Sequence, residues 1–392
     1  MRREPEALRQ ALTQLADQSL LRRRVIDGAS AELAARGHAL RNGRDVINFC
    51  GNDYLGLSRH PQVAAAMAQA ASSLGAGAGA SHLVSGHGPQ HEALERELAD
   101  FTGREAALLF STGYMANLGA LSALAAHGET IAQDKLNHAS LIDAAQLSGA
   151  RLRRYTHLDM ESASQVAQSA EHLAVIATDG VFSMDGDIAP LPQLATLAQQ
   201  SHSWLIVDDA HGLGVLGATG RGCCEQFGLS PERVPVLVGT LGKAFGSFGA
   251  FVAGSAELID YLLQRARTAI YTTALPQAVA AASRAALRVA QRESWRREKL
   301  HELTMRFRER AALRGLQLGG SNTPIQPVII GDPARTLRIS DALLAAGFWV
   351  SAIRPPTVPQ DTARLRVTLS ASHEIGDVDA LVDALTMTLA TC

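Results

Sequence analysis

Short apolar runs alternate with alanine- and leucine-rich stretches along residues 46–276. The runs "AALLF", "TIAQD", "HLAVIATDGVF", "WLIVDDAHG" and "VPVLVGTL" have the length and composition of buried strands, and the segments between them suit helices. Strands that are apolar at nearly every position need cover on both faces, which is typical of parallel sheets. The alternation therefore predicts an α/β fold with a mostly parallel central sheet and helices on both of its faces.

The two ends of the chain depart from this alternation. Residues 4–24 have the pattern of an amphipathic helix that ends in three arginines and packs as an arm on the body. Beyond the alternating region come long helices, among them "RESWRREKLHELTMRFRERAALRG", and then strands near "PIQPVIIG", "WVSAIRP" and "RLRVTLS". A chain of 392 residues is too long for one ordinary core. We expect an N-terminal helical arm over 1–45, a large α/β domain over 46–290 and a small C-terminal α+β domain over 291–392.

The overall composition argues against several classes of partner and site. A net charge of −2 gives no electrostatic reason to expect nucleic acid or an anionic membrane as partner. No uninterrupted apolar run reaches 18 residues, and the charged start lacks the apolar core of a signal peptide, so we expect a cytoplasmic protein. The cysteines offer no CxxC pairing, so we expect neither a metal site nor a disulfide framework. They are Cys50, Cys223, Cys224 and Cys392.

Two glycine-rich segments imitate dinucleotide-binding loops. "GAGAGA" at 75–80 follows a predicted helix instead of a strand. "GLGVLG" at 212–217 follows a strand but opens no convincing helix, and no acidic residue stands about 20 positions later at a strand end. "GTLGKA" likewise lacks the glycine spacing and the Ser or Thr of a P-loop. A nicotinamide-dependent dehydrogenase and a nucleotide triphosphatase are therefore disfavoured.

The segment "STGYMANLGAL" at 111–121 has a better context. It lies directly after the strand "AALLF" and opens a helix, so its small residues expose backbone amides at the positive end of that helix. This arrangement would bind an anion such as a phosphate. Plain N-capping by Ser111 or Thr112 explains the same residues equally well. Only the neighbours of this segment can decide between the two.

One lysine is placed where chemistry is expected. Only three of the 36 basic residues are lysines, namely Lys135, Lys243 and Lys299. Arginine stays charged in proteins, whereas a lysine in apolar surroundings can lose its proton and act as a nucleophile or base. Lys243 lies in the glycine-rich, apolar stretch "VPVLVGTLGKAFGSFGAFVAG". It is the first candidate for catalysis, and a surface lysine on a loop is the plain alternative.

Other polar side chains follow the ends of the predicted strands, where ligands of such sheets gather. A nucleophilic amine, an acid, two imidazoles and a phosphate cradle are together what pyridoxal 5'-phosphate (PLP) requires. The amine bonds the aldehyde, a carboxylate keeps the pyridine nitrogen protonated, and an imidazole stacks on the ring. Adjacent strand residues point to opposite faces, so only one of the two neighbouring aspartates can reach the ring. The strand ends supply His138, Asp179, Ser183, Asp185, Asp208, Asp209, His211 and Thr240.

Three motifs resemble those of a known family. "VFSMDGDIAPL", "VDDAHGLGVLG" and "GTLGKAFGSFGA" are similar to motifs of the α-oxoamine synthases, PLP-dependent transferases of fold type I (aspartate aminotransferase-like). The resemblance runs from "NDYLGLS" to "RLRVTLS", nearly the whole chain. "AIRPPTVPQDTARLRVTL" most resembles the biotin-pathway branch, which joins L-alanine to a pimeloyl thioester of coenzyme A or acyl carrier protein. A branch that uses glycine or serine with a different acyl-CoA is the alternative, and a non-catalytic subunit would be expected to lack Lys243.

The resemblance implies a role for each matching residue. Lys243 bonds the cofactor aldehyde and later serves as base, and Asp208 meets the pyridine nitrogen. His138 stacks on the ring, and the implied catalytic set is Lys243, His138, Asp208 and His211. A threonine from a second subunit, Thr272 or Thr273, implies a homodimer with shared sites. The implied cofactor contacts are Gly113, Tyr114, His138, Ser183, Asp208, His211, Thr240, Lys243 and Thr273.

The resemblance also implies a substrate end of the site. Arg366 matches the position that binds the amino acid's carboxylate, and strand alternation puts it on the same face as Arg364. A structural salt bridge would explain such an arginine as well. Asn52 and Arg22 are expected to frame the substrate, and Arg354 to face the acyl chain.

The glycine loop departs from the family's pattern. Many relatives read "GSGGSRLVSG" where this chain reads "GAGASHLVSG", which puts Ala80 and His82 at changed positions. The expected catalytic residues are unaffected. The contacts that this loop makes with cofactor or thioester are in doubt.

Overall fold

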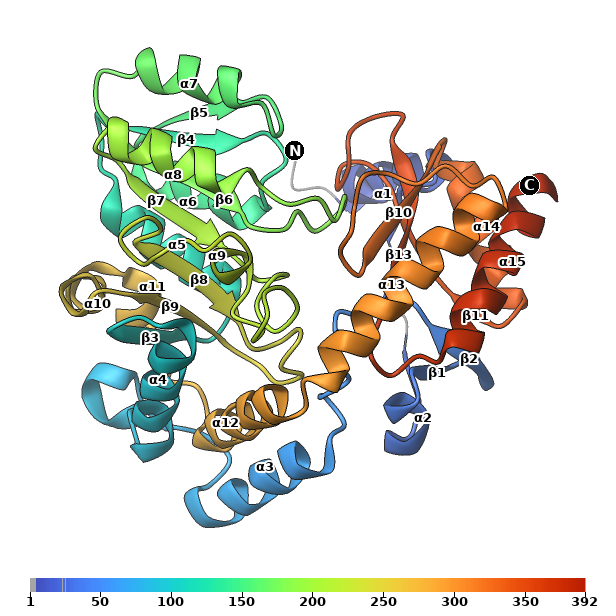
Figure 1. Cartoon of the computed structure of the whole chain (residues 1–392), viewed down its shortest axis with the longest axis horizontal. Coiled ribbons are helices and arrows are strands. Elements are labelled where there is room, and N and C mark those ends of the chain that lie inside the picture. Colours follow the sequence, from blue (N-terminus) through green and yellow to red (C-terminus); the bar gives the residue numbers. More distant parts are fainter. Residues whose placement is uncertain (1–4, 23, 25, 392) are drawn as a thin grey trace. The chain divides into compact units, whose positions relative to one another are not determined.

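The computed structural model describes residues 5–22, 24 and 26–391 (Figure 1). The chain divides into two compact units. We call residues 53–183 with 187–297 the sheet unit. The terminal unit combines the segment that ends at Asn52 with Met184–Gly186 and the C-terminal segment that begins at Glu298.

The sheet unit is built on seven strands in the order β3-β9-β8-β7-β6-β4-β5. Neighbours from β8 to β5 run parallel, and β9 is antiparallel to both β3 and β8. The mostly parallel central sheet predicted from the sequence is therefore confirmed. The strands are β3 (Ala106–Phe110), β4 (Thr130–Asp134), β5 (Arg151–Tyr155), β6 (Leu173–Asp179), β7 (Trp204–Asp208), β8 (Val236–Thr240) and β9 (Ala250–Gly254).

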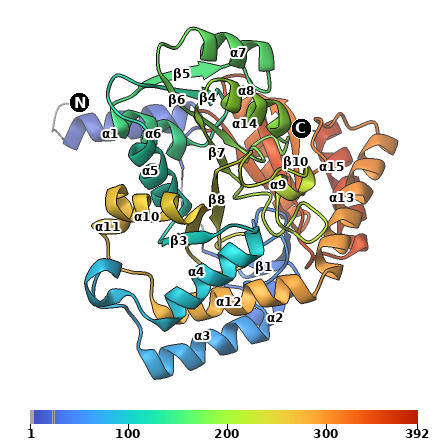
Figure 2. The same ribbon diagram turned by 60° about the vertical axis from the view of Figure 1, so that its left-hand side comes forward.

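Helices cover both faces of this sheet, as its apolar strands require (Figure 2). On β7, Ile206 joins the core under α5, while its neighbours Leu205 and Val207 point to the other face, where α8 packs. The helices are α3 (Pro61–Leu74), α4 (Pro89–Thr102), α5 (Gly113–Leu124), α6 (Ala139–Ser148), α7 (Met160–Gln168), α8 (Leu191–Gln200), α9 (Cys223–Gln226), α10 (Ala256–Arg265), α11 (Arg267–Ile270), α12 (Gln277–Arg292) and the π-turn η1 (His82–Gly86).

One edge of the sheet collects the chain's polar strand ends. The parallel strands β4, β6, β7 and β8 finish there in Asp134, Asp179, Asp208 and Thr240. Because β9 is antiparallel to both β3 and β8, β3 runs in the same direction as β8 and delivers the start of α5 to this edge as well. The topology thus brings a helix N-terminus and several reactive side chains together.

The terminal unit holds two three-stranded sheets, β1-β2-β11 and β10-β13-β12. Strands predicted near "PIQPVIIG", "WVSAIRP" and "RLRVTLS" are found as β10, β11 with β12, and β13. The strands are β1 (His38–Arg41), β2 (Arg44–Asn48), β10 (Ile325–Gly331), β11 (Phe348–Trp349), β12 (Ser351–Ile353) and β13 (Ala363–Thr368). The helices are α1 (Pro5–Asp17), α2 (Ala31–Ala35), α14 (Pro333–Ala345), α15 (Ile375–Thr391) and α13 (Trp295–Leu313), whose first turn lies in the sheet unit.

The N-terminal segment differs from the separate arm expected over 1–45. β2 pairs in parallel with β11, Ile47 with Phe348 and Asn48 with Trp349, so the segment shares a sheet with residues from near the other end of the chain. The amphipathic helix is also shorter than expected, because α1 ends at Asp17 and Ser19 adopts a left-handed conformation with φ 58°. Glu4 and Arg23, which that expectation included, lie outside the described residues.

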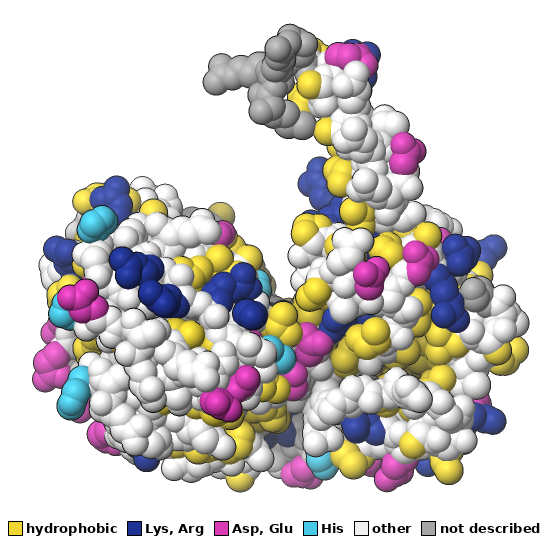
Figure 3. All heavy atoms as spheres, turned by 90° about the horizontal axis from the view of Figure 1, so that it is seen from above, with side chains coloured by type: hydrophobic (Ala, Val, Ile, Leu, Met, Phe, Trp, Pro, Cys, Tyr) yellow, Lys and Arg dark blue, Asp and Glu magenta, His cyan; other side chains and the backbone are white. Residues whose placement is uncertain are grey.

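Charges of both signs share the face of the molecule that Figure 3 draws. On the face drawn in Figure 3, acidic and basic side chains are interspersed, in agreement with the net charge of −2. Among the described residues, no helix combines the length and the apolar character needed to cross a bilayer.

Candidate active site

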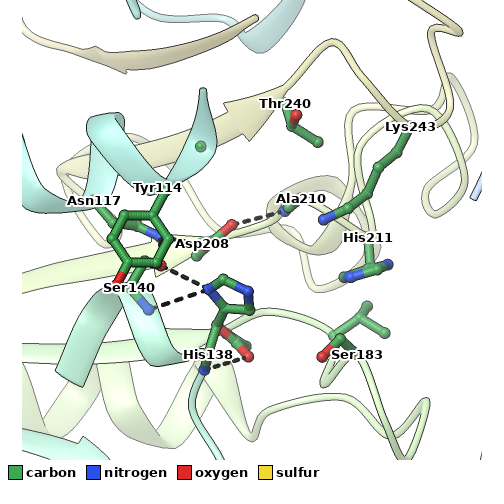
Figure 4. A pocket seen from close by; sticks show the side chains of 13 residues that line it. Tyr114, Asn117, His138, Ser140, Ser183, Asp208, Ala210, His211, Thr240 and Lys243 are labelled. Atoms are coloured by element: carbon green, nitrogen blue, oxygen red, sulfur yellow. Dashed lines mark hydrogen bonds between the residues drawn. The ribbon is translucent and has the colours of Figure 1, made fainter. Parts of the chain in front are cut away.

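A pocket of about 200 Å³ opens at the polar edge of the sheet unit (Figure 4). Its walls come from the ends of β6, β7 and β8 and from the first turns of α5 and α6. Most of the cofactor residues predicted from the sequence line it. The lining residues are Gly113, Tyr114, Asn117, His138, Ser140, Asp179, Val181, Ser183, Asp208, Ala210, His211, Thr240 and Lys243.

Asp208 supplies a fixed carboxylate at the end of β7. Its side chain is buried, with 7% of the residue exposed. Oδ2 accepts a hydrogen bond of 2.6 Å from Asn117 Nδ2, and Oδ1 accepts one of 3.1 Å from the backbone N–H of Ala210. Two donors from different elements therefore set the direction in which this carboxylate faces the pocket.

Asp209 lies on the other side of the same strand end. It is fully buried, and its Oδ2 accepts a 2.7 Å hydrogen bond from the backbone N–H of Cys223. Burial raises the pKa of its carboxyl group to about 7. Asp209 is absent from the pocket lining. Side chains of adjacent strand residues point to opposite faces, so only one of the two aspartates can face the pocket. That residue is Asp208.

Lys243 enters the pocket from the loop after β8. Figure 4 shows its side chain extending past His211, with the amine directed towards the end of β7. The ring of His211 is oriented by Tyr54, whose hydroxyl lies 2.7 Å from His211 Nδ1. The amine, the carboxylate of Asp208 and this imidazole thus face one common space.

His138 lies opposite Lys243, at the N-cap of α6. Its backbone N–H donates to Asp179 Oδ2 at 3.0 Å, and its Nδ1 lies 2.7 Å from Ser140 Oγ. Burial lowers the pKa of His138; nearby Asp208 opposes that shift and Lys243 adds to it. This shift favours the neutral form of the ring, and a neutral ring suits stacking on an aromatic ligand.

The start of α5 forms the end of the pocket that could hold a phosphate. Thr112 is the N-cap and accepts a 3.2 Å hydrogen bond from the Met115 N–H. Gly113 and Tyr114 follow in the first turn, and a Cβ added to Gly113 would meet nothing within 4 Å. Capping and anion binding are thus compatible, because the cap uses a different N–H from the two that line the pocket.

These residues fit PLP. The N-terminus of α5 offers amides to a phosphate, Asp208 offers an acceptor to a ring N–H, and Lys243 offers an amine to an aldehyde. Ser183 and His211 line the same pocket and can reach a ring hydroxyl, and His138 can cover a ring face. Each functional group of the cofactor therefore has a counterpart of suitable chemistry.

The remaining predicted site residues do not line this pocket. Thr272 and Thr273 follow α11 and are partly or fully exposed. In the terminal unit, Arg366 is buried on β13, where its guanidinium donates to Asn52 Oδ1 at 3.2 Å and to Thr368 Oγ1 at 3.0 Å. Arg364, on the same face, pairs with the carboxylate of Asp185.

Arg22 and Arg354 lie near each other in the same unit. Arg22 donates to Thr357 Oγ1 at 2.8 Å, and Arg354 donates to the backbone carbonyl of Ser19. Burial lowers the pKa of Arg354, and the positive charge of Arg22 lowers it further. Two cations that approach each other in this way would be stabilised by an anionic group.

Three residues of the site were missed from the sequence. Asn117 and Ser140 line the pocket, and Tyr54 orients His211. Asn117 had a usable signal, because it is a polar residue one turn after Gly113 in a helix that is otherwise apolar on its buried side. Tyr54 lies within the motif "NDYLGLS", but no local pattern links it to a histidine 157 positions away.

Comparisons with known proteins agree with this geometry. The family model described as Aminotransferase class I and II matches residues 44–385. The 8-amino-7-oxononanoate synthase of Thioalkalivibrio sulfidiphilus is 57% identical over 367 residues, covering 93% of this chain and 92% of that protein.

Solved structures show the same fold. A serine palmitoyltransferase from S. paucimobilis, with PLP and myriocin bound, has a TM-score of 0.92 and 29% identity, covering 98% of this chain and 97% of that one. An 8-amino-7-oxononanoate synthase from Francisella tularensis has a TM-score of 0.78 and 32% identity, covering 88% and 98%. The chain therefore belongs to the aminotransferase class I and II family, with fold type I and PLP as its cofactor, and within that family it groups with the proteins named 8-amino-7-oxononanoate synthase.

Proposed function

We propose that the chain catalyses the decarboxylative condensation of L-alanine with a pimeloyl thioester in biotin biosynthesis. The products are 8-amino-7-oxononanoate, carbon dioxide and the free thiol carrier. The observation that carries the proposal is the convergence of Lys243, Asp208 and His138 in one pocket. The high identity to a protein named for this product supplies the substrate class.

Each of three pocket residues has its own proposed role in the reaction. PLP supplies an aldehyde carbon that bonds amines and a conjugated ring that takes up electrons from the amino acid. Asp208 would accept a hydrogen bond from the pyridine nitrogen and so favour its protonated form. Lys243 would hold the cofactor through its side-chain amine, and the same amine, when free, would accept the Cα proton of alanine. His138 would cover the ring, and the lowered pKa of its imidazole favours the uncharged form there.

The amide N–H groups of Gly113 and Tyr114, with Thr240, are proposed to hold the phosphate. They lie at the positive end of α5 and at the end of β8, on the rim of one pocket. Ser183 and His211 are proposed to bind the ring hydroxyl. The aromatic ring of Tyr114 stands nearly perpendicular to that of His138, with the ring centroids 6.3 Å apart, an edge-to-face arrangement that aromatic pairs favour.

The substrate end of the site belongs to this proposal as well. Arg366 is proposed to bind the carboxylate of alanine with help from Asn52, because a buried guanidinium held by an amide oxygen keeps a strong preference for carboxylates. Arg22 and Arg354 are proposed to face the acyl group, whose distal carboxylate would balance their paired positive charge.

We further propose a cytoplasmic homodimer in which Thr273 reaches the partner's phosphate. Thr273 is exposed and lies outside the pocket of its own chain. Light scattering should then give twice the mass of one chain. Mixing Lys243→Ala chains with Thr273→Ala chains should regain activity, because one site of each mixed dimer receives neither change. A monomer, or a mixture no more active than its parts, would refute shared sites.

Replacing Lys243 by alanine tests the catalytic assignment. Turnover and the visible absorption of the lysine-bound cofactor should disappear together. Lys135→Ala is the matched control, because Lys135 also follows a strand at the same edge but is exposed outside the pocket. Full activity in Lys243→Ala would overturn the proposal.

A second candidate is condensation of serine with a long-chain acyl-CoA. The higher TM-score to serine palmitoyltransferase favours it, but that likeness rests on 29% sequence identity. The purified protein should be offered alanine, glycine and serine, each with pimeloyl-CoA, pimeloyl-acyl carrier protein and palmitoyl-CoA. Product from alanine with either pimeloyl thioester supports the proposal, and product only from serine with palmitoyl-CoA supports the alternative.

A further inference from the structure

Three histidines and two glutamates gather where the altered glycine loop leads into α4. They are His82, His87, His91, Glu92 and Glu95, all in the sheet unit and outside the PLP pocket. Within the described residues, these side chains form two overlapping groups whose possible ligand atoms lie within 4.8 Å of one another. One group is His82, His87 and His91, and the other is His87, Glu92 and Glu95. We propose that His87, Glu92 and Glu95 form a zinc-binding site.

Two of the three separations between the ligand atoms are close to those of a tetrahedral zinc site. His87 Nε2 lies 3.3 Å from Glu92 Oε2 and 3.9 Å from Glu95 Oε2. With bonds of about 2.0–2.1 Å, the ligand atoms of such a site stand roughly 3.3 Å apart. The first distance already fits, and the second needs a shift of about half an ångström, which a glutamate side chain can make.

The two carboxylates are placed by the helix. Glu92 and Glu95 are three positions apart on α4, so they lie on one face, one turn from each other. Glu95 Oε1 accepts a 2.9 Å hydrogen bond from the Leu109 N–H, which leaves Oε2 facing His87. Glu95 is mostly buried, with 16% of its side chain exposed, whereas Glu92 at 69% keeps the site open to ions from solvent.

His82 acts through His87. The Nδ1 atoms of the two imidazoles are 2.8 Å apart, so one donates to the other. When His87 Nε2 binds a metal, its Nδ1 carries the proton and donates it to His82. Metal-binding histidines commonly have their second nitrogen fixed in this way. This contact gives a role to the histidine that distinguishes this chain's glycine loop from "GSGGSRLVSG".

His91 is not a ligand in this arrangement, although its ring centroid lies 4.9 Å from that of His82. Its Nδ1 accepts a 3.0 Å hydrogen bond from the Gly88 N–H, and its Nε2 lies 2.5 Å from the Leu275 carbonyl oxygen. Both nitrogens are committed to the backbone. The three-histidine group is therefore the weaker candidate. In the His87 group, by contrast, the contacts of His87 Nε2 within the described residues are with the two glutamate carboxylates, and a metal ion would replace the proton shared between them.

Zinc bound here would fasten the end of the glycine loop to α4. The loop is otherwise held by backbone contacts such as the 2.9 Å hydrogen bond from Ala274 N–H to the Ala80 carbonyl. Hydrogen exchange of the amides in 82–88 should therefore slow when zinc is added.

Titration of the full-length, PLP-loaded protein with Zn²⁺ tests the site, with Co²⁺ absorption as a second readout. We expect one zinc per chain. His87→Gln should weaken binding more than 100-fold, Glu95→Gln at least 10-fold, and His82→Gln about 10- to 100-fold. His172→Gln, at an exposed histidine elsewhere in the sheet unit, is the control and should bind as the wild type does.

The outcomes separate the possibilities. Retained cofactor absorption and circular dichroism show that each variant is folded. The proposal is overturned if the wild type takes up no stoichiometric zinc, or if His87→Gln binds it as well as the wild type. It is also overturned if His82→Gln abolishes binding while Glu95→Gln leaves it unchanged, because the ligands would then be imidazoles alone.

Discussion

The two sides of the end of β7 carry the same residue type in opposite environments. Asp208 faces a polar pocket and is held by two donors, Asn117 and Ala210. Asp209 faces a tight turn in which Gly180, Gly212 and Gly222 crowd its side chain. One carboxylate has room for a ligand and the other has no room for a methyl group. The direction in which the strand projects each side chain, and not its residue type, separates a binding carboxylate from a structural one.

Asp208→Asn should have the largest effect on activity. An amide cannot hold the proton on the pyridine nitrogen as a carboxylate does, so kcat should fall about 10³-fold, the upper end of the loss when one preorganised electrostatic partner is removed. Folding stability should change little, because Asn can still accept from Asn117 or Ala210. Steady-state kinetics and thermal unfolding measure the two effects separately. Normal activity in Asp208→Asn combined with an inactive Asp209→Asn would reverse the assignment of the two sides.

The burial of Asp209 should make the free energy of unfolding depend on pH. Burial raises the pKa of Asp209 from 3.8 to about 7, so the folded protein keeps a proton that the unfolded chain releases. The stabilisation from that proton is present below the unfolded pKa and is lost as the pH rises through about 7.

Asp209→Asn removes this titration. Between pH 4 and 7 the wild type should therefore lose stability relative to the variant, by as much as about 4 kcal/mol. Urea unfolding at several pH values checks this. A stability difference that stays constant with pH would show that Asp209 titrates alike in both states.

Gly222→Ala tests the packing around Asp209, because the added methyl group would collide with the carboxylate. Gly222 has φ +80°, and an added Cβ would lie 1.9 Å from Asp209 Oδ2. Both the backbone conformation and the contact oppose a side chain, so the free energy of unfolding should fall by about 3 kcal/mol. Gly128→Ala is the control, because it shares a positive φ but has open space around it. Equal losses in the two variants would attribute the effect to the backbone alone.

Local sequence pattern predicted the residues at the strand ends but not their partners. Asp208, Lys243 and Thr240 follow apolar runs, and alternation already limited the pocket to one of the two aspartates. The contact of Tyr54 with His211 spans 157 positions, and the pairing of β2 with β11 spans about 300. Such contacts depend on how separate elements pack, which no local period records. The altered loop at His82 was visible from the sequence, yet its contact with His87 requires the fold of the π-turn.

A change at Asn117 should have the smallest effect on activity, and it tests how the carboxylate of Asp208 is held in the pocket. Its Nδ2 donates to Asp208 Oδ2 at 2.6 Å and to Ser140 Oγ at 2.8 Å, so it ties the carboxylate to the residue that contacts His138. Asn117→Ala leaves Asp208 its bond to Ala210 and should lower kcat about 10-fold.

Asn117→Asp separates positioning from packing at the same site. It keeps the shape of the side chain but sets a second carboxylate against Asp208, so the two would compete for one proton and the loss of activity should exceed that of the alanine variant. A structural role alone would give the reverse order, because the isosteric variant would then be the less damaging one. The ranking of the two kcat values therefore decides whether Asn117 acts on the charge of Asp208 or only fills space beside it.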